Sequence, residues 1–575
     1  MEFRLPIEYG EDVKRLDGDA TRDLEILSSV SVDAPLVDVM LGRRGAEWDS
    51  GGVRERMATT FTTDAVFLKE MAGAVAAFGD SWAHDFGGED HADRLIAEVV
   101  GMSEPEFCET FMFLPRDLGL PVPASMAAEV AKLAGAINAS EPCQRAAHVY
   151  RTVHPLTYML MPVFLLFLPF VVLVLQGSCV TFGRYVHVMW TQVLPSHDAT
   201  RLFTDFWRMS WAQCVQSVLT TGLFLYSLYG NAVNWFAHQS LRQRVLEIDA
   251  AARRVLRTGE GRIRRLIEAH KCLTASAFVE HLCAIRQALP ELPKTAGIGC
   301  EFAALHTVYR HREAMRALLD VGIYHHAIQH LNMLPLTAVA FGGGPEEEKG
   351  DKEAKGDTEA EEATKEKIHV AIDVVGLRFP FLHRAARPHT LLMDRDVVVT
   401  GKNGTGKTTF LKSVFLNVLV AQQFGVAFAD SMRIRAPFAH LHCTINIPDT
   451  SARDSLFQAE AARCKRIADL ITSSSPSPST PSAMPPCHLC IFDELFSGTN
   501  PVDATDSSAY LLAHLAQQPH ALVLVSTHYP DIDAPHILRV KTNDRHDILP
   551  GTERETGRGL EIIQQQLNLV SSPSP

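Results

Sequence analysis

The first strong pattern in the chain is a long apolar stretch without fixed charge. No Asp, Glu, Lys or Arg lies between Arg151 and Arg184, and residues 155–176 read PLTYMLMPVFLLFLPFVVLVLQ. A helix needs roughly 20 apolar residues to cross a hydrocarbon core of about 30 Å, so this run is long enough. A helix that is apolar on every side is rare in water. The pattern therefore predicts a transmembrane helix, with a buried core helix as the alternative.

A second charge-free interval, residues 209–241, carries a polar stripe. Its polar residues recur at helical spacing, which places them on one side of a helix. They are Gln213, Ser217, Thr220, Ser227, Asn231 and Asn234. We interpret this interval as a second span whose polar side meets the first, so that 155–176 and 211–232 form a two-helix transmembrane hairpin. The alternative is an amphipathic helix that lies against the C-terminal domain or a membrane surface.

Arginines crowd the sequence just after the second interval. They are Arg242, Arg244, Arg253, Arg254, Arg257, Arg262, Arg264 and Arg265, whereas the predicted loop between the spans holds Arg184, Arg201 and Arg208. Because positive residues favour the cytosolic side, this bias predicts a multi-pass membrane protein with two spans and both termini in the cytosol. The same arginines could instead contact anionic lipid or nucleic-acid phosphate, or form a solvated helix face.

The remaining pattern divides the chain into regions. Residues 1–150 are mainly helical in pattern, 151–240 hold the hairpin, and 241–341 repeat apolar residues at the spacing of packed, lever-like helices. An acidic linker follows at 342–367. The last region, 368–575, has the pattern of one domain that is interrupted by a Ser/Pro-rich loop at 473–486.

Composition and charge limit the classes of protein that fit this layout. The 575 residues suggest about three or four domains, and 46% apolar residues exclude wholesale disorder. The net charge is −13, so any nucleic-acid binding would need a local basic patch. The eleven scattered cysteines indicate a reduced compartment, and the charged N-terminus lacks the apolar core of a secretory signal.

The C-terminal domain carries a glycine-rich loop between a β-branched run, 397–400, and a helix-like stretch. The loop sequence GKNGTGKTT is the P-loop pattern in its strand–loop–helix context, and it predicts nucleotide and Mg²⁺ binding. Backbone N–H groups would surround the phosphates, Lys407 would reach the β- and γ-phosphates, and the Thr408 hydroxyl would ligate Mg²⁺. The residues predicted to bind the nucleotide are Gly401, Asn403, Gly404, Gly406, Lys407, Thr408 and Thr409.

Two further strand-like segments end in reactive side chains. The apolar run 487–492 ends in Asp493 and Glu494, and adjacent carboxylates in that position are costly unless a cation or a water needs them. We predict that Asp493 holds Mg²⁺ and that Glu494 orients or deprotonates the attacking water. The run 521–525 leads into His528, which we predict to lie across from the γ-phosphate as a third catalytic residue beside Glu494 and Lys407.

Taken in order, GKNGTGKTT, FDELFSGTNPVDA and STHY resemble the ATPase domain of MutS-type mismatch-repair proteins. The resemblance covers about 370–533 and implies an α/β P-loop NTPase of the ABC/MutS-like class, which binds and hydrolyses ATP with Mg²⁺. Ser455 resembles the serine that reaches the nucleotide of the partner subunit, which implies a homodimer formed through the ATPase domain. By the same resemblance, Gln422 or Gln423 corresponds to the glutamine loop. The turn after the acidic pair corresponds to Gly498, Thr499 and Asp503.

The resemblance stops at the ATPase domain and the helices before it. Phe107-Cys108-Glu109 has the spelling of the family's mismatch-reading wedge but lies in an acidic, helix-like context, so we interpret it as a coincidence. The main hypothesis is therefore a membrane-anchored, dimeric MutS-like ATPase that uses ATP to switch helical arms. The alternative is a DNA mismatch-repair or DNA-binding homologue that acts as an ATP-dependent damage sensor.

Two further hypotheses fit less well. An ABC-type transporter half is disfavoured because two spans are too few for a solute path and no LSGGQ-like segment lies between Gly401 and Asp493. A non-enzymatic tether is disfavoured by the intact Lys407, Asp493 and Glu494.

Overall fold

The computed structural model describes most of the chain. It covers residues 2–29, 34–42, 51–78, 89–115, 123–175, 179–188, 210–271, 276–294, 299–342, 371–382, 385–445, 456–474, 486–497, 499–529, 537–543 and 545–552, with the single residues 47, 49, 177 and 532. Ser455 and Gly498 of the sequence prediction lie outside the described residues, as do most of the acidic linker and of the Ser/Pro-rich loop. The chain divides into two compact units. The first comprises Met1–Asp90, Thr258–Gln287 and Arg316–Pro575, and the second comprises His91–Arg257 and Ala288–Met315.

The first unit contains a six-stranded sheet in the order β13-β12-β6-β11-β10-β9. Its strands are β6 (Val397–Thr400), β9 (Phe438–Thr444), β10 (Cys487–Asp493), β11 (Ala521–Thr527), β12 (Leu538–Thr542) and β13 (Ile548–Pro550). The neighbours from β12 to β9 run parallel, and β13 joins antiparallel. Every residue of β6 and β11 is buried, as expected for parallel strands covered on both faces.

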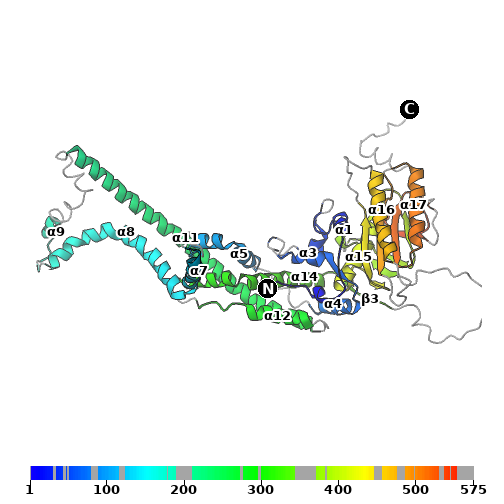
Figure 1. The fold of residues 1–575 in the computed structure, drawn as a ribbon, viewed down its shortest axis with the longest axis horizontal. Helices are drawn as coiled ribbons and strands as arrows, with labels where there is room; N and C mark the ends of the chain where they lie inside the picture. The colour runs from blue at the N-terminus through cyan, green and yellow to red at the C-terminus, as the bar shows by residue number, and fades with distance from the viewer. Residues whose placement is uncertain are drawn as a thin grey trace, which may run out of the picture. The chain divides into compact units, whose positions relative to one another are not determined.

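Three helices flank this sheet in Figure 1: α15 (Lys407–Phe424), α16 (Leu456–Ser473) and α17 (Pro501–Ala516). α16 and α17 share one core with Phe492 of β10 and Val525 of β11. α15 contacts the same two strands but contributes no residue to that core, so it covers the opposite face. Gly406 and Gly425 bound α15 with φ values of 94° and 69°, which glycine adopts without strain.

The N-terminal segment lies against α15. Its elements are η1 (Pro6–Tyr9), β1 (Val13–Arg15), α1 (Gly18–Asp23), α2 (Leu36–Leu41), α3 (Val53–Thr59), β2 (Thr60–Thr62) and α4 (Ala65–Ala77). β2 and α4 contact α15, and α1 contacts β9. A Cβ atom on Gly425 would lie 2.0 Å from the carbonyl oxygen of Leu68, so the two backbones approach too closely for a larger residue. The first residues of the chain therefore belong to the same folded unit as the six-stranded sheet.

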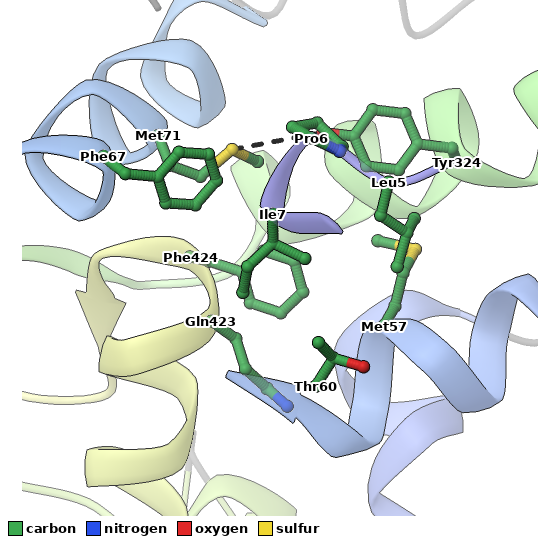
Figure 2. A pocket seen from close by; sticks show the side chains of 10 residues that line it. All are labelled: Leu5, Pro6, Ile7, Met57, Thr60, Phe67, Met71, Tyr324, Gln423 and Phe424. Atoms are coloured by element: carbon green, nitrogen blue, oxygen red, sulfur yellow. Dashed lines mark hydrogen bonds between the residues drawn. The ribbon is translucent and has the colours of Figure 1, made fainter. Parts of the chain in front are cut away.

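A small cavity marks this junction, as Figure 2 shows. It has a volume of about 20 Å³, and Ile7, Phe67 and Phe424 are among the apolar residues that line it. The hydroxyl of Thr60 and Oε1 of Gln423 also belong to lining residues, and both atoms are buried without a hydrogen-bond partner among the described residues. A space of this size has room for about one water molecule.

A second sheet in this unit has five strands in the order β5-β4-β8-β3-β7. They are β3 (Thr337–Phe341), β4 (Ile372–Leu377), β5 (His389–Met393), β7 (Val426–Ala427) and β8 (Ser431–Ile434), with a short η6 (Pro380–Leu382) after β4. Two helices bring aromatic side chains to the unit: α12 (Ser276–Ala288) and α14 (Arg312–Met333). Tyr324 of α14 is fully buried near Phe3 and Phe278, and its hydroxyl lies 2.9 Å from Nε2 of His270.

The second unit is helical in its described part. Its helices are α5 (Glu89–Gly101), α6 (Glu104–Phe111), α7 (Ala124–Ala139), α8 (Glu141–Leu175), α9 (Phe182–Val188), α13 (Cys300–Arg310) and most of α11 (Trp211–Ala269). Phe107 is only 1% exposed, and its ring stacks on Tyr309 with centroids 3.8 Å apart. Because this ring is part of the core, Phe107-Cys108-Glu109 cannot serve as a wedge that reads DNA.

Several of the clustered arginines on α11 pair with carboxylates. Arg242 bonds Glu301 at 2.8 Å, and Arg244 bonds Glu98 at 2.6 Å. Arg253 bonds Asp249 at 3.0 Å on the same helix. These ion pairs partly neutralise the positive charge of the clustered arginines, which weakens the case for a surface that attracts phosphate or anionic lipid.

The predicted transmembrane hairpin is not supported. Among the residues that the structure describes, no helix combines the length and the apolar character needed to cross a membrane. The two predicted spans are segments of longer helices. α8 begins in polar sequence at Glu141, and α11 continues beyond the second span through the clustered arginines to Ala269. Residues 189–209 between them, and several side chains of the first span, lie outside the described part.

The prediction weighed each apolar run by itself, without the polar residues that share its helix. The membrane localisation with two spans and both cytosolic termini rested on the hairpin, and it is corrected with it.

Candidate nucleotide site

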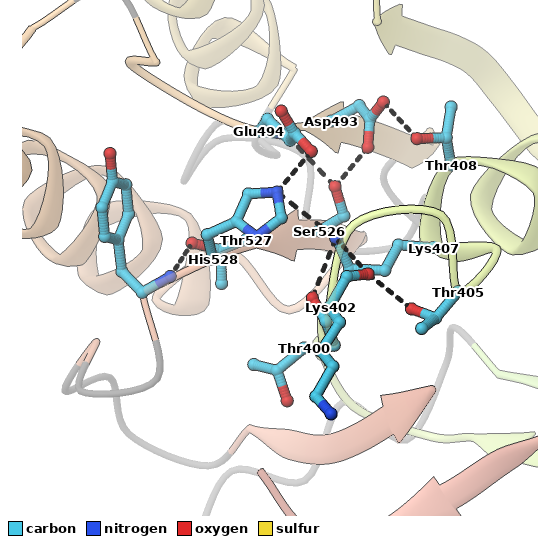
Figure 3. A network of polar contacts seen from close by, with 12 residues as sticks. Thr400, Lys402, Thr405, Lys407, Thr408, Asp493, Glu494, Ser526, Thr527 and His528 are labelled. Carbon is cyan, nitrogen blue, oxygen red and sulfur yellow. Dashed lines mark hydrogen bonds and ion pairs between the residues drawn. The ribbon is translucent and has the colours of Figure 1, made fainter. Parts of the chain in front are cut away.

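Strand register gathers the three sequence motifs at one edge of the six-stranded sheet. Asp493 at the end of β10 pairs with Ser526 of β11, and Thr527 of β11 pairs with Thr400 at the end of β6. Because the strands are parallel, their carboxyl ends meet. The P-loop, the acidic pair and His528 therefore lie together, as Figure 3 shows.

The glycine-rich loop contacts the end of β12 through hydroxyl groups. The Thr405 hydroxyl donates to the Lys402 carbonyl at 2.7 Å and lies 2.6 Å from the hydroxyl of Thr542. A Cβ atom on Gly401 would lie 2.1 Å from that Thr542 hydroxyl, so this position requires glycine. Gly404 also has a positive φ of 75°. The predicted binding residues Asn403, Gly404 and Thr409 are exposed around the loop.

Lys407 opens α15 and turns its ammonium back into the loop. Its Nζ donates to the carbonyl oxygens of Gly401 at 2.9 Å and Lys402 at 3.3 Å, and it lies 3.3 Å from Nε2 of His528. The residue is only 4% exposed. The loop therefore presents a fixed positive charge beside the catalytic candidates.

Thr408 and Asp493 meet as the sequence predicts for a Mg²⁺ site. The Thr408 hydroxyl donates to Oδ2 of Asp493 at 2.8 Å, and the Ser526 hydroxyl donates to the other carboxylate oxygen. Burial raises the pKa of Asp493, while the two hydroxyl hydrogen bonds oppose this effect. A hydroxyl and a carboxylate are oxygen ligands of the kind that Mg²⁺ prefers.

Glu494 and His528 form a pair next to the Lys407 ammonium. Nε2 of His528 lies 2.7 Å from Oε1 of Glu494. The hydrogen bond from His528 is the largest cause that holds the pKa of Glu494 below its usual value. The Glu494 side chain is 40% exposed, so water can reach it. Its backbone has a φ of 51°, an unfavourable conformation of the kind found at functional sites.

The structure does not bring every predicted residue to this edge. Gln422 and Gln423 lie at the far end of α15, about 22 Å from Lys407 at roughly 1.5 Å per residue. Nε2 of Gln422 donates to the carbonyl of Thr62 at 3.0 Å, and Nε2 of Gln423 donates to the carbonyl of Ala58 at 2.7 Å. These glutamines fasten the N-terminal segment to α15, so the assignment to a glutamine loop is corrected.

The residues after the acidic pair have a local structural role. Asn500 caps α17 by accepting the backbone N–H of Asp503 at 2.9 Å.

Sequence reasoning gave no role to Ser526 and did not consider Thr542. Ser526 bonds Asp493, and Thr542 supports the loop at Thr405 and Gly401. A signal for Ser526 existed, since it occupies the end of the strand that leads into His528. Thr542 had none, because β12 is a short strand far along the chain.

A glycine-rich loop between a buried strand and a helix, with carboxylates at the end of a neighbouring parallel strand, defines a P-loop domain. Comparison with known families gives a more specific class. Residues 397–546 match the family model of MutS domain V. This range contains the P-loop, the acidic pair and His528.

Known relatives agree over the same part of the chain. Endonuclease MutS2 of Synechocystis sp. is 31% identical over 176 residues, which cover 28% of this chain and 21% of that protein. Endonuclease MutS2 of Staphylococcus carnosus is 27% identical over 141 residues, or 24% of this chain and 16% of that protein. DNA mismatch repair protein MutS of Syntrophomonas wolfei is 27% identical over 161 residues, or 26% and 17%.

The chain therefore spans about a fifth or less of the length of these curated relatives. The matches support a protein of the MutS family, on its ATPase-type domain.

Proposed function

We propose that this protein is a MutS-type ATPase that binds and hydrolyses ATP as a dimer and couples the cycle to DNA. One observation carries the proposal. The hydrogen-bonded pairs Thr408–Asp493 and His528–Glu494, with the Lys407 ammonium 3.3 Å from Nε2 of His528, converge at the edge where the P-loop follows β6. This arrangement supplies a cation, a metal-ligating pair and a base within one site.

The chemistry of the donor set fits a magnesium nucleotide. The exposed loop from Asn403 to Gly404 and the start of α15 offer backbone N–H groups to phosphate. Lys407 would exchange its carbonyl partners for phosphate oxygens. Thr408 and Asp493 would hold Mg²⁺, which when bound supplies positive charge to the phosphates.

Glu494 is the proposed base for water. Its low pKa keeps it ionised at neutral pH, so it can accept a hydrogen bond or a proton from an attacking water. His528 orients the carboxylate through Nε2 and lies beside Lys407, where a γ-phosphate would change its contacts. The sequence prediction that Ser455 acts in the partner's site stays part of this proposal.

DNA is the proposed partner because of the named relatives rather than the surface. The similar proteins are called endonucleases MutS2 and a DNA mismatch repair protein. The buried Phe107 argues against mismatch reading by that residue. We therefore favour an ATP-dependent DNA-binding homologue and leave the preference for mismatches to experiment.

The nucleotide half is tested with the purified full chain. Lys407→Ala should abolish tight binding of a fluorescent ATP analogue, because the mobile cation on the phosphates is lost. Lys465→Ala is the matched control, since that lysine is exposed and pairs with the exposed Asp469 in the next turn of α16. Equal binding by the wild type and Lys407→Ala would contradict the assignment.

The DNA half is tested by duplex binding with and without ATP at several salt concentrations. Phosphate contacts should make the affinity fall with salt, and ATP should change it in the wild type but not in Lys407→Ala. A preference of about tenfold for mismatched duplex, or roughly 1.4 kcal/mol, would extend the proposal to lesion sensing. No duplex binding at low salt would remove DNA from the proposal and leave the ATPase standing.

A dimer is tested by mixing subunits. If Ser455 completes the neighbour's site, subunits with Ser455→Ala and with Lys407→Ala should give mixed dimers in which one site carries both lesions. The other site is then intact, so the mixture should be more active than either variant alone. No gain on mixing would argue against shared sites.

A further inference from the structure

A buried ion pair joins the N-terminal segment to α16, outside the nucleotide site. Nη2 of Arg463 donates to Oδ2 of Asp23 at 2.8 Å, and the two side chains are 8% and 0% exposed. The same Nη2 donates to the Cys443 carbonyl at 2.6 Å, and the N–H of Ile445 donates to Oδ2 of Asp23 at 3.1 Å. One carboxylate from α1 therefore holds both the end of β9 and the middle of α16.

α16 in turn supports the turn that follows Glu494. The ring of Phe457 lies 5.4 Å from that of Phe496, and the Ser497 hydroxyl donates to Oε1 of Glu460 at 3.4 Å. Phe496 has a φ of 58°, close to the value of Glu494. Two left-handed residues so near each other cost free energy, and they persist only where surrounding contacts hold them.

We propose that Asp23 is a positioning residue for the ATPase, which fixes α16 through Arg463 and thereby holds the turn that aims Glu494 at its water. The part of this inference that concerns ATP hydrolysis rests on the proposed function. It gives the N-terminal segment a role in the active site, because Asp23 accepts the N–H of Ile445 just past the carboxyl end of β9, the strand beside β10. A local change at Asp23 should then be felt at Glu494 and less at the P-loop.

The kinetic test compares three variants of the full chain. Asp23→Asn paired with Arg463→Met removes both buried charges, so folding need not suffer, since such replacements are often neutral or stabilising. Asp23→Glu keeps the charge but displaces the carboxylate by one methylene. Asp19→Asn is the matched control on the same helix, because Asp19 lies 4.0 Å from Arg463 and 3.6 Å from Arg466 and is more exposed.

We expect kcat to fall about tenfold to a hundredfold in the double variant while KM for ATP stays within about threefold, because a small displacement of a catalytic group costs rate more than binding. Asp23→Glu should show a smaller fall of the same kind, and Asp19→Asn should match the wild type. If the double variant melts like the wild type and also keeps its kcat, the pair is merely structural and the proposal is overturned. If the double variant does not fold, a wild-type kcat in Asp23→Glu overturns it equally.

Hydrogen exchange gives a readout that needs no ATP turnover. The N–H of Glu494 donates to the carbonyl of Ser526 at 3.1 Å, and that of Ile445 donates to Asp23. Both should exchange faster in Asp23→Glu, whereas the amides of β11 should not. If the wild type hydrolyses no ATP, the proposed function fails while faster exchange still supports the positioning, and unchanged exchange at Glu494 refutes it.

Discussion

Both ends of the strands in the six-stranded sheet carry histidine, one at the carboxyl edge and four at the amino side, yet the two ends differ in chemistry. At the carboxyl edge, His528 contacts Glu494 and Lys407. At the amino side, four histidines cluster on β9, β10 and the residue before β11: His440, His442, His488 and His520. The residue type alone does not distinguish His528 from the four amino-side histidines.

Burial and partners separate these two groups. Nε2 of His442 lies 3.1 Å from Nδ1 of His488, and His488 is fully buried. Burial, and then the neighbouring histidines, lower the pKa of His488 to about 2, and burial is also the largest cause that lowers the pKa of His442 to about 4. His442 and His488 are thus neutral packing residues, whereas the carboxyl-edge histidine has a carboxylate partner and access to water. The role of a histidine here follows from its contacts.

The largest effect is expected at the carboxyl edge. Glu494→Gln should keep ATP bound while the rate of hydrolysis falls by about 10²–10⁴-fold, because only the base is lost. Nucleotide binding and single-turnover hydrolysis measure the two properties separately. Asp469→Asn, an exposed carboxylate on α16, serves as control. Unchanged turnover in Glu494→Gln would contradict the assignment of Glu494 as the base.

The next effect tests His528 directly. His528→Ala should lower kcat by about 10- to 100-fold, less than loss of the base itself. The pKa of Glu494 should rise without its main hydrogen bond, so the acidic limb of the kcat profile should move to higher pH. His488→Phe is the comparison at the amino side, and it should leave both kcat and the profile unchanged. A shift in the second variant rather than the first would reverse the contrast between the edges.

The amino-side histidines should matter for acid stability instead. His442 and His488 are neutral when folded but take up protons in the unfolded chain below a pKa of about 6.5, so stability should fall as pH drops from there. Each contributes a slope of about 1.4 kcal/mol per pH unit until its folded pKa is reached. His488→Phe should therefore lose less stability than the wild type between pH 7.5 and 5, as measured by urea unfolding. An equal loss in both proteins would show that His488 does not stay neutral.

The smallest effect concerns a buried polar atom away from both edges. The Thr60 hydroxyl has no partner among the described residues, whereas the Thr62 hydroxyl on the same strand accepts the N–H of Asp64 at 3.2 Å. Thr60→Val should stabilise the fold by about 1 kcal/mol and Thr62→Val should destabilise it by a similar amount. Thermal unfolding checks both. A destabilised Thr60→Val would mean that a water in the adjoining cavity satisfies the hydroxyl.

Local chemistry made the nucleotide site visible in the sequence. The P-loop, the acidic pair and His528 each follow a short apolar strand, and parallel strands must bring their carboxyl ends together. For that reason the sequence could assign Thr408 and Asp493 to one Mg²⁺ site, Glu494 to the attacking water and His528 to a place across from the γ-phosphate. Gln422 and Gln423 were instead assigned by resemblance, without an argument from strand ends, and that assignment was wrong. Their amides are used for packing against the N-terminal segment.

The sequence by itself thus determined the P-loop class of the C-terminal domain and predicted the residues that meet at its carboxyl edge, because those signals are contained in runs of ten residues or so. It misjudged the two apolar runs: each lies in a longer helix that extends at one end into polar and charged sequence, and no described helix is long and apolar enough to cross a membrane. Tertiary structure alone decided that the first residues of the chain join the unit that contains the P-loop domain. Asp23 and Arg463 stand 440 positions apart, and neither has a local signature. Their pairing depends on burial created by the fold, which no window of sequence contains.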